Sequence, residues 1–351
     1  MSYTDIDDSS VHFQTTLYTG NGGTLAVTND GNSDLQPDWV WTKKRSDTSH
    51  HALVDSSRGA TKQIYTNLTA AEETVSGVTA FNTDGFTLGS NGTANLNGAT
   101  FVGWQWKANG GTTASNTTGS VTSTVQVNSD AGFSIVTFDS ASSGNFSVGH
   151  GLGVQPAMII TKNREGTGQW YTWHQHLTGG TSNTSYLLSL NRTDAEESFA
   201  NAWGAGVTSS VFGMQSGNTA TASNDYIAYC FAEKQGYSKF GKYVGNSNDN
   251  GTFVYLGFKP RWLMIKSATE VGMTWDIIDT ARSTSNVMDD YLTAHTTDPQ
   301  GTSSTKNIDF LSNGFKCRDD NNINFSDHTY IYMAFAEHPF VTSTGVPTTA
   351  R

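Results

Sequence analysis

The sequence predicts an all-β protein built from three tandem antiparallel β-sandwich repeats. The first observation behind this prediction is a segment that occurs three times, in which a proline precedes a short apolar run and a lysine stands six residues after the proline. The copies lie at 37–43, 156–162 and 260–266. Proline lacks a backbone N–H and therefore fits the first residue of a strand, and the β-branched and aromatic residues behind it are typical of a buried strand.

The second observation is that other landmarks keep their distance from the proline. The separations between the proline and the last aromatic residue of the closing strand are 69, 75 and 75 residues, for the pairs Pro37–Trp106, Pro156–Phe231 and Pro260–Phe335. A Gly-Phe block precedes each closing strand in the first and third copies, and Val211-Phe212 stands at that place in the second. A repeat of about 100 residues has the size of a small β-sandwich.

The third observation is the composition. Charged residues make up 15% of the 351 residues, against about 25% in typical globular domains. Glycine, serine, threonine and asparagine take their place, which favours short strands joined by turns over helices. The net charge of −11 argues against nucleic acid as a partner, because such binding depends on lysine and arginine. No apolar run reaches the roughly 18 residues of a membrane-spanning helix, so no membrane insertion is expected.

The first β-sandwich repeat is predicted to occupy residues 1–108. A hairpin turn is indicated by Gly20-Asn21-Gly22-Gly23, since such turns need left-handed backbone that glycine and asparagine accept. Strands are expected at 13–19, behind Pro37, and at 51–55, 84–88 and 101–106, with a short helical turn at 69–73. Residues 109–131 consist almost entirely of Gly, Ser, Thr, Asn and Ala with a small β-like run at 121–127, and they are predicted to form a linker.

The second repeat is predicted at 132–235 and the third at 236–340, followed by a polar tail at 341–351. Strands of the second repeat are expected at 132–138, behind Pro156, and at 169–174, 186–190, 210–212 and 226–233, with a helical turn at 193–197. Strands of the third are expected at 236–240, behind Pro260, and at 275–279, 313–315 and 330–337. The two cysteines, Cys230 and Cys317, lie in or beside apolar strands and are expected to be buried free thiols.

An Asp-x-x-Arg pair occurs twice, as Asp55/Arg58 and Asp279/Arg282, whereas the second repeat has His174 and Leu177 at these places. The pair is either a ligand clamp or a strand-end turn, in which the aspartate caps the backbone and the arginine pairs beside it. We favour the turn, because function usually lies in sites added to a fold and not in its repeated frame.

The lysine that follows each proline strand also recurs in every repeat, which indicates a structural role. The simplest expectation is a lysine whose ammonium group snorkels to solvent from the end of the strand. The predicted structural frame of the repeats consists of Pro37, Lys43, Asp55, Arg58, Pro156, Lys162, Pro260, Lys266, Asp279 and Arg282.

Neither a metal nor a catalytic residue is assigned from the sequence. His50, His51, His174 and His176 lack a third ligand at zinc-site spacing and are expected to be solvated or hydrogen-bonded. The loops at 29–34, 246–251 and 318–322 are rich in oxygen ligands but lack the EF-hand spacing, so no cofactor is assigned and calcium stays open. Because nucleophile, phosphate-loop and zinc-protease motifs are missing, we predict that the protein is not an enzyme.

Three features together resemble a known family: the proline–lysine strand, the Gly-Phe block, and closing strands such as 226–233. Further landmarks of the resemblance are 149–153, 236–240 and 309–315. From about Phe13 to Phe340 the chain is similar to repeat-bearing proteins of marine bacteriophages, described as tail-fibre, receptor-binding or capsid-associated structural proteins. The resemblance implies lectin-like or SPRY-like jelly-roll sandwiches at the virion surface and no catalytic residues. Since the first residues do not resemble a signal peptide, synthesis in the host cytoplasm is expected.

Two functions stay open under this resemblance. One is an adhesin, a tail-fibre or receptor-binding protein that holds a host surface glycan or receptor by non-covalent, multivalent binding. The other is a purely structural part, such as a capsid decoration, a head fibre or a tail adaptor. The expected partners are other virion proteins and further copies of this chain, arranged as a homotrimer. The candidates for stacking on a sugar, with core packing as the alternative, are Trp170, Trp173, Trp262 and Trp275.

Overall fold

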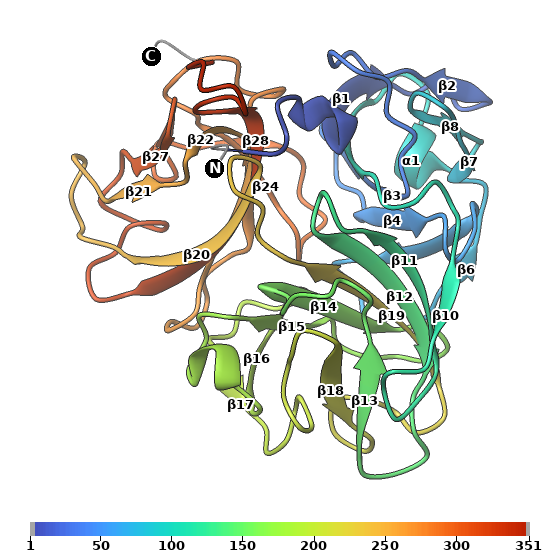
Figure 1. Cartoon of the computed structure of the whole chain (residues 1–351). Helices are drawn as coiled ribbons and strands as arrows, with labels where there is room; N and C mark the ends of the chain where they lie inside the picture. The colour runs from blue at the N-terminus through green and yellow to red at the C-terminus, as the bar shows by residue number, and fades with distance from the viewer. Residues whose placement is uncertain (1–3, 349–351) are drawn as a thin grey trace.

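The computed structural model describes residues 4–348, and almost every regular element in it is a β-strand (Figure 1). The antiparallel sheets form three pairs, each with one large and one small sheet, which confirms the all-β prediction with three units. Among the described residues, helical structure is limited to α1 (Gly92–Asn95) and two three-residue 3₁₀ turns at Ser9–Val11 and Gly180–Ser182. No helix in this part of the chain is long and apolar enough to cross a membrane.

Unit 1 (13–106) pairs a six-stranded sheet with a three-stranded sheet. The large sheet has, in spatial order, β1 (Phe13–Thr19), β9 (Thr100–Trp106), β3 (Trp39–Lys44), β4 (Ala52–Asp55), β5 (Lys62–Tyr65) and β6 (Glu73–Thr74). The small sheet has β2 (Leu25–Val27), β8 (Phe86–Leu88) and β7 (Val78–Phe81). Val40 and Val54 of the large sheet pack against Phe86 and Leu88 of the small one.

Unit 3 (238–339) repeats this plan. Its large sheet has β20 (Ser238–Val244), β28 (Thr329–Pro339), β22 (Phe258–Ser267), β23 (Asp276–Asp279), β24 (Asp290–Thr293) and β25 (Gly301–Thr302). Its small sheet has β21 (Phe253–Tyr255), β27 (Gly314–Cys317) and β26 (Ile308–Leu311). Leu263 and Ile265 take the place of Val40 in the core between the two sheets, where they pack with Phe315.

Unit 2 (114–231) has the same plan with a longer large sheet. This sheet has β10 (Ala114–Asn116), β11 (Ser123–Asn128), β12 (Phe133–Asp139), β19 (Asp225–Phe231), β14 (Met158–Asn163), β15 (Tyr171–His174), β16 (Tyr186–Ser189) and β17 (Glu197–Ser198). The small sheet pairs β13 (Asn145–Gly149) with β18 (Val211–Gln215). Residues 109–131, expected as a linker, therefore contain two strands, and β11 pairs with β12 along six residues.

The helical turns expected at 69–73 and 193–197 are absent, since both segments are extended. Each segment bridges two units through its backbone. Glu72 N donates to Arg164 O of unit 2 at 2.8 Å, and Glu196 N donates to Ala268 O of unit 3 at 2.7 Å. The backbone hydrogen bonds that a helical turn would need are thus replaced by hydrogen bonds to a neighbouring unit.

The proline strand is the central, buried strand of each large sheet. β3 and β14 begin two residues after Pro37 and Pro156, whereas β22 starts at Phe258 and shifts its register at Pro260. That shift is expected, because proline cannot donate to the ladder and is tolerated at an irregularity of the pairing. Every residue of β3 and of β14 is buried.

Burial on both faces explains why this strand has no polar face. Along β3, Trp39 and Trp41 point to a core shared by the three units, while Val40 points into the core of its own sandwich. Met158 and Ile160 of β14 join the shared core in the same way, and Ile159 stays inside unit 2. Successive side chains of a strand alternate between its faces, so a strand between two cores must be apolar throughout.

The three large sheets meet at the shared core, and the small sheets lie at the periphery (Figure 1). The last aromatic residue of each closing strand lies near the centre. The ring centroids of Trp106 and Phe335 are 5.6 Å apart, and those of Phe231 and Phe335 are 6.2 Å apart. The three sandwiches are therefore packed around one aromatic core, in addition to the core that each encloses.

Candidate functional site

The four tryptophans expected as sugar-stacking candidates are buried. Trp170, Trp173 and Trp262 are 0% exposed, and Trp275 is 1% exposed. Trp170 Nε1 donates to the carbonyl oxygen of Tyr65 in unit 1 at 2.9 Å, and Trp275 Nε1 to that of Ser189 in unit 2 at 3.0 Å. These rings face protein, as in the alternative of core packing, and they offer no surface to a sugar.

Both Asp-x-x-Arg pairs have the geometry of a strand-end turn. Asp55 Oδ1 accepts the backbone N–H of Arg58 at 2.9 Å, and Oδ2 lies 2.5 Å from the arginine Nε. The corresponding distances for Asp279 and Arg282 are 3.0 and 2.6 Å. The four side chains are fully buried, so a ligand has no access to them.

Each of these aspartates also joins two units. Tyr229 of unit 2 donates its hydroxyl to Asp55 Oδ2 at 2.7 Å, and burial raises the pKa of Tyr229 so that it keeps this proton. Trp104 of unit 1 donates Nε1–H to Asp279 Oδ2 at 3.0 Å. At the same place in unit 2, His174 Nε2 lies 3.3 Å from the carbonyl oxygen of Tyr332 in unit 3. At this position, unit 1 therefore contacts unit 2, unit 2 contacts unit 3, and unit 3 contacts unit 1.

His174 suits this position as a neutral donor. Burial lowers the pKa of His174 to about 3, so the ring is uncharged at neutral pH. The Nδ1 atom accepts the backbone N–H of His176 at 3.2 Å, which assigns the proton to Nε2 and directs it to the Tyr332 carbonyl.

The repeated lysines do not reach solvent as expected, because their side chains end inside the interfaces. Lys43, Lys162 and Lys266 are 0% exposed. Their Nζ atoms donate across an interface to a threonine carbonyl oxygen, with distances of 3.2, 3.0 and 3.3 Å for Lys43–Thr297, Lys162–Thr69 and Lys266–Thr193. The same three oxygens each accept a backbone N–H from the unit that supplies the lysine. Burial lowers the pKa of each lysine to about 8.

Histidines and polar loops form hydrogen bonds within the protein. His51 Nδ1 accepts Nε1–H of Trp41 at 2.9 Å, and burial lowers its pKa well below the usual value. In the loop at 29–34, Asn29 Oδ1 accepts from both Thr16 and Gln105. Within residues 4–348, no group of three or more His, Cys, Asp or Glu side chains is arranged to hold a metal ion. Cys230 and Cys317 are buried free thiols.

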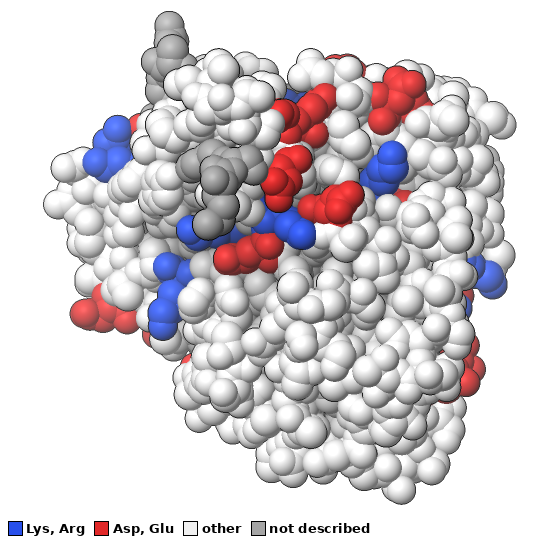
Figure 2. Space-filling view, viewed as in Figure 1, with Lys and Arg blue, Asp and Glu red and all other residues white. Residues whose placement is uncertain are grey.

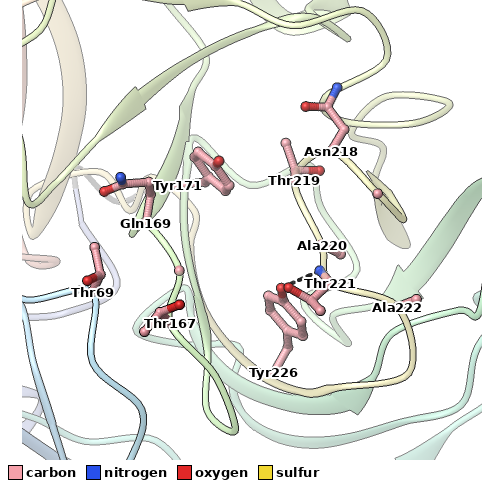
Figure 3. Close-up of a pocket in the computed structure, with 12 residues that line it drawn as sticks. Thr69, Thr167, Gln169, Tyr171, Asn218, Thr219, Ala220, Thr221, Ala222 and Tyr226 are labelled. Carbon is pink, nitrogen blue, oxygen red and sulfur yellow. Dashed lines mark hydrogen bonds between the residues drawn. The ribbon is translucent and has the colours of Figure 1, made fainter.

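A cavity of about 510 Å³ opens on unit 2, and we call it the second-unit cavity. One wall is the segment 167–171, which leads into β15, and the other is the segment 217–222 between β18 and β19 (Figure 3). Tyr226 of β19 lines it from below in this view, and Thr69 of unit 1 completes it at the side. All twelve residues that line it are uncharged.

Hydrogen bonds hold the segment 217–222 in place. Thr219 Oγ1 donates to the carbonyl oxygen of Ala202 at 2.6 Å, and Asn218 Nδ2 donates to that of Ala200 at 3.2 Å. Thr221 N donates to the hydroxyl oxygen of Tyr226 at 2.8 Å. These contacts come from backbone and side chains on both sides of the segment, so the wall exists before any ligand arrives.

The scarcity of charged side chains extends beyond the cavity on unit 2. Figure 2 shows one face of the molecule, on which most charged side chains gather toward the centre and the upper part. The lower part, where the β13–β18 sheet lies in Figure 1, presents almost only uncharged side chains. The surface of unit 2 on this face is therefore nearly free of charged side chains.

The cavity was not predicted from the sequence, because its residues come from four separate stretches of the chain. One signal was available: Tyr171 stands at a position where the repeats differ. The strand registers place Ala52 of unit 1, Tyr171 of unit 2 and Asp276 of unit 3 at the same site. Frame residues keep their type in at least two units, whereas this position changes in all three.

The chain belongs to the family described as "Domain of unknown function (DUF7483)", which matches residues 8–339. The match covers all three units, so the family corresponds to the complete three-unit body and not to one sandwich. Comparisons with curated proteins and with solved structures gave no match.

Proposed function

We propose that this protein is a bacteriophage virion protein, a tail-fibre or receptor-binding adhesin that contacts the host cell surface by non-covalent, multivalent binding. The observation that carries the proposal is a division between two kinds of polar residue. Repeated polar residues such as Asp55 and Lys162 are buried and bind other parts of the protein. Some unrepeated polar residues, such as Asn218 and Thr221 of the segment 217–222, lie instead on an outer loop and line the second-unit cavity. A rigid frame that presents different neutral surfaces suits recognition of a receptor.

The finer fold assignment belongs to this proposal. We propose that each unit is a lectin-like or SPRY-like jelly roll, since each encloses an apolar core between a large and a small antiparallel sheet. We also propose that the virion carries the protein as a homotrimer in contact with other virion proteins, because several weak receptor contacts on one particle act together.

One observation favours the alternative of a capsid decoration, head fibre or tail adaptor. Phe253 and Tyr255 are 45% and 49% exposed on β21, and both line a cavity of about 550 Å³ beside Lys239 and Lys242. An exposed aromatic patch with a polar rim is typical of a protein–protein contact. In an adhesin, this patch would bind a neighbouring virion protein.

Electron microscopy, assays of cell coating and infection, and light scattering test the proposal. Immunogold electron microscopy of intact particles should place the protein on the tail, and purified protein should coat host cells and block infection. Labelled heads together with a failure to coat cells would overturn the adhesin and favour the decoration protein. Light scattering should give three times the 37.8 kDa of one chain, and a monomer at micromolar concentration would overturn the homotrimer.

A further inference from the structure

We propose that the second-unit cavity is the receptor site and that it binds an uncharged saccharide. This inference rests on the proposed adhesin function, because it names the ligand class and the part of the chain that binds it.

The charge of the lining selects a neutral ligand. None of the side chains that line the cavity carries a charge, so an anionic or cationic ligand would lose hydration there without gaining an ion pair. The tyrosines are neutral at physiological pH, because the ordinary pKa of a tyrosine is about 10 and burial raises the pKa of both Tyr171 and Tyr226 further. A ligand with hydroxyl groups and no charge matches this lining.

The cavity also keeps polar atoms available for such hydroxyl groups. Among the described residues, no protein group binds the hydroxyl of Tyr171, the hydroxyl of Thr167 or the amide nitrogen of Gln169. Gln169 is oriented for this, because its Oε1 accepts from Asn191 at 2.6 Å and its Nε2 is left to donate. Asn218 is the complement: its Nδ2 is bound to Ala200 and Gln215, and its Oδ1 is left to accept. Donors and acceptors thus face one cavity from both walls.

Tyr171 adds an apolar surface between these polar atoms. Its ring is half-buried and lies beside Phe199, with ring centroids 6.5 Å apart, so one side is supported by protein. In Figure 3 the ring stands between Gln169 and the wall formed by Asn218 and Thr219. A sugar ring has C–H faces and a hydroxyl rim, and an aromatic ring flanked by amide and hydroxyl groups can contact both.

The equivalent positions of the other two units do not provide this surface. Ala52 of unit 1 is buried and has no aromatic ring. Asp276 of unit 3 forms an ion pair with Lys306 at 2.7 Å, and the lysine ammonium lies 4.1 Å from the centroid of the Tyr291 ring. The same strand position thus occurs in all three units, but only unit 2 has an aromatic side chain there.

The test uses the full chain on a glycan array with neutral hexose and N-acetylhexosamine oligosaccharides, and with sialylated and uronic-acid-containing ones for comparison. We expect binding to neutral probes only, and the Kd for the strongest neutral probe, from titration calorimetry, should stay within about twofold when NaCl is raised, because no ion pair forms. Tyr171→Ala should weaken this binding by about tenfold or more, and Tyr171→Phe by less. Binding to acidic probes alone, or to none, would overturn the inference.

Tyr255→Ala is the matched control, since it removes an exposed tyrosine from unit 3 and should leave the Kd unchanged. Equal thermal melting of all variants shows that the fold is kept. If the protein coats host cells and Tyr171→Ala coats them equally well, the adhesin stands and the cavity assignment is wrong. If the cavity binds neutral saccharides but the protein does not coat host cells, the saccharide site stands and the adhesin function is wrong.

Discussion

The interfaces between the units and the second-unit cavity use polar residues in opposite ways. At the interfaces, charged groups are buried, repeat around the core and bind a partner in the next unit, as Lys162 binds the carbonyl of Thr69. In the cavity, the polar side chains are neutral, and several of them keep hydrogen-bonding atoms free, as Tyr171 does. The difference teaches that the polar residues repeated in the units hold the scaffold together, whereas Tyr171, which has no aromatic counterpart in units 1 and 3, lines a cavity.

The largest expected effect comes from a charge inside the scaffold. Ile159 is fully buried in the core of unit 2, on the central strand β14. Ile159→Asp should destabilise the protein by more than about 4 kcal/mol, because an unpaired carboxylate would lose its hydration there. The loss should extend beyond unit 2, since β14 also contributes to the shared core, and chemical denaturation followed by tryptophan fluorescence measures it.

The control for this variant is Val154→Asp, five residues earlier at a side chain that is 50% exposed. It should change the free energy of unfolding by about 0.5 kcal/mol or less. Equal stability of the Ile159 variant and this control would show that β14 is not a buried strand.

A slightly smaller effect is expected from breaking a buried ion pair. Asp279→Asn leaves the Arg282 guanidinium buried without its counter-ion and weakens the acceptor of Trp104 Nε1–H. The expected loss is about 3 kcal/mol. Arg192→Ala removes a half-exposed pair with Asp194 and should cost less than about 1 kcal/mol. Similar losses for the two variants, measured by thermal melting, would contradict the distinction between interface and surface.

The interface lysines predict a pH dependence of stability. Their pKa in the folded protein is about 8, below the ordinary 10.5, so between these values the unfolded chain binds more protons than the folded chain. The free energy of unfolding should therefore rise between about pH 7.5 and 9.5, on the order of 1 kcal/mol per lysine. Above about pH 10 the buried tyrosines oppose this rise, because burial raises their pKa in the folded protein only.

Urea denaturation at a series of pH values measures this rise. A variant with Lys43→Met, Lys162→Met and Lys266→Met should lose most of it, since methionine fills a similar volume without a proton to release. A rise that is unchanged in this variant would assign the pH dependence to other groups.

The smallest expected effect is the difference in stability loss between two threonine-to-alanine substitutions, one at an interface and one at the cavity. Thr66 Oγ1 is buried at the interface and donates to the carbonyl of Ala294 in unit 3 at 2.7 Å, so Thr66→Ala should cost about 1 kcal/mol. Thr167 lies exposed at the cavity, and Thr167→Ala should change stability by less than about 0.5 kcal/mol. Calorimetric melting resolves the two, and a larger loss for Thr167 would mean that the cavity wall belongs to the scaffold.

The sequence by itself determined the number of units and the place of their central strands. Both follow from local chemistry. Proline has no backbone N–H to donate to a neighbouring strand, so it is typical of the position where a strand begins. An unbroken apolar run such as 158–160 indicates a strand that is covered on both faces. The Asp-x-x-Arg turn is local in the same sense, because the residues that cap and pair are three positions apart. The composition likewise determined that strands and turns prevail over helices.

Only the tertiary structure decided what covers each face of these strands. Trp39 and Val40 are adjacent in sequence, yet Trp39 packs among the three units and Val40 packs inside unit 1. Both residues are hydrophobic, so hydrophobicity alone does not distinguish these two environments. The burial of Trp170, the carbonyl that binds Lys43 and the walls of the second-unit cavity depend on segments about 100, 250 and 50 residues apart. Contacts of this range are set by how the sheets pack, because a strand's pattern records which face is buried and not which partner buries it.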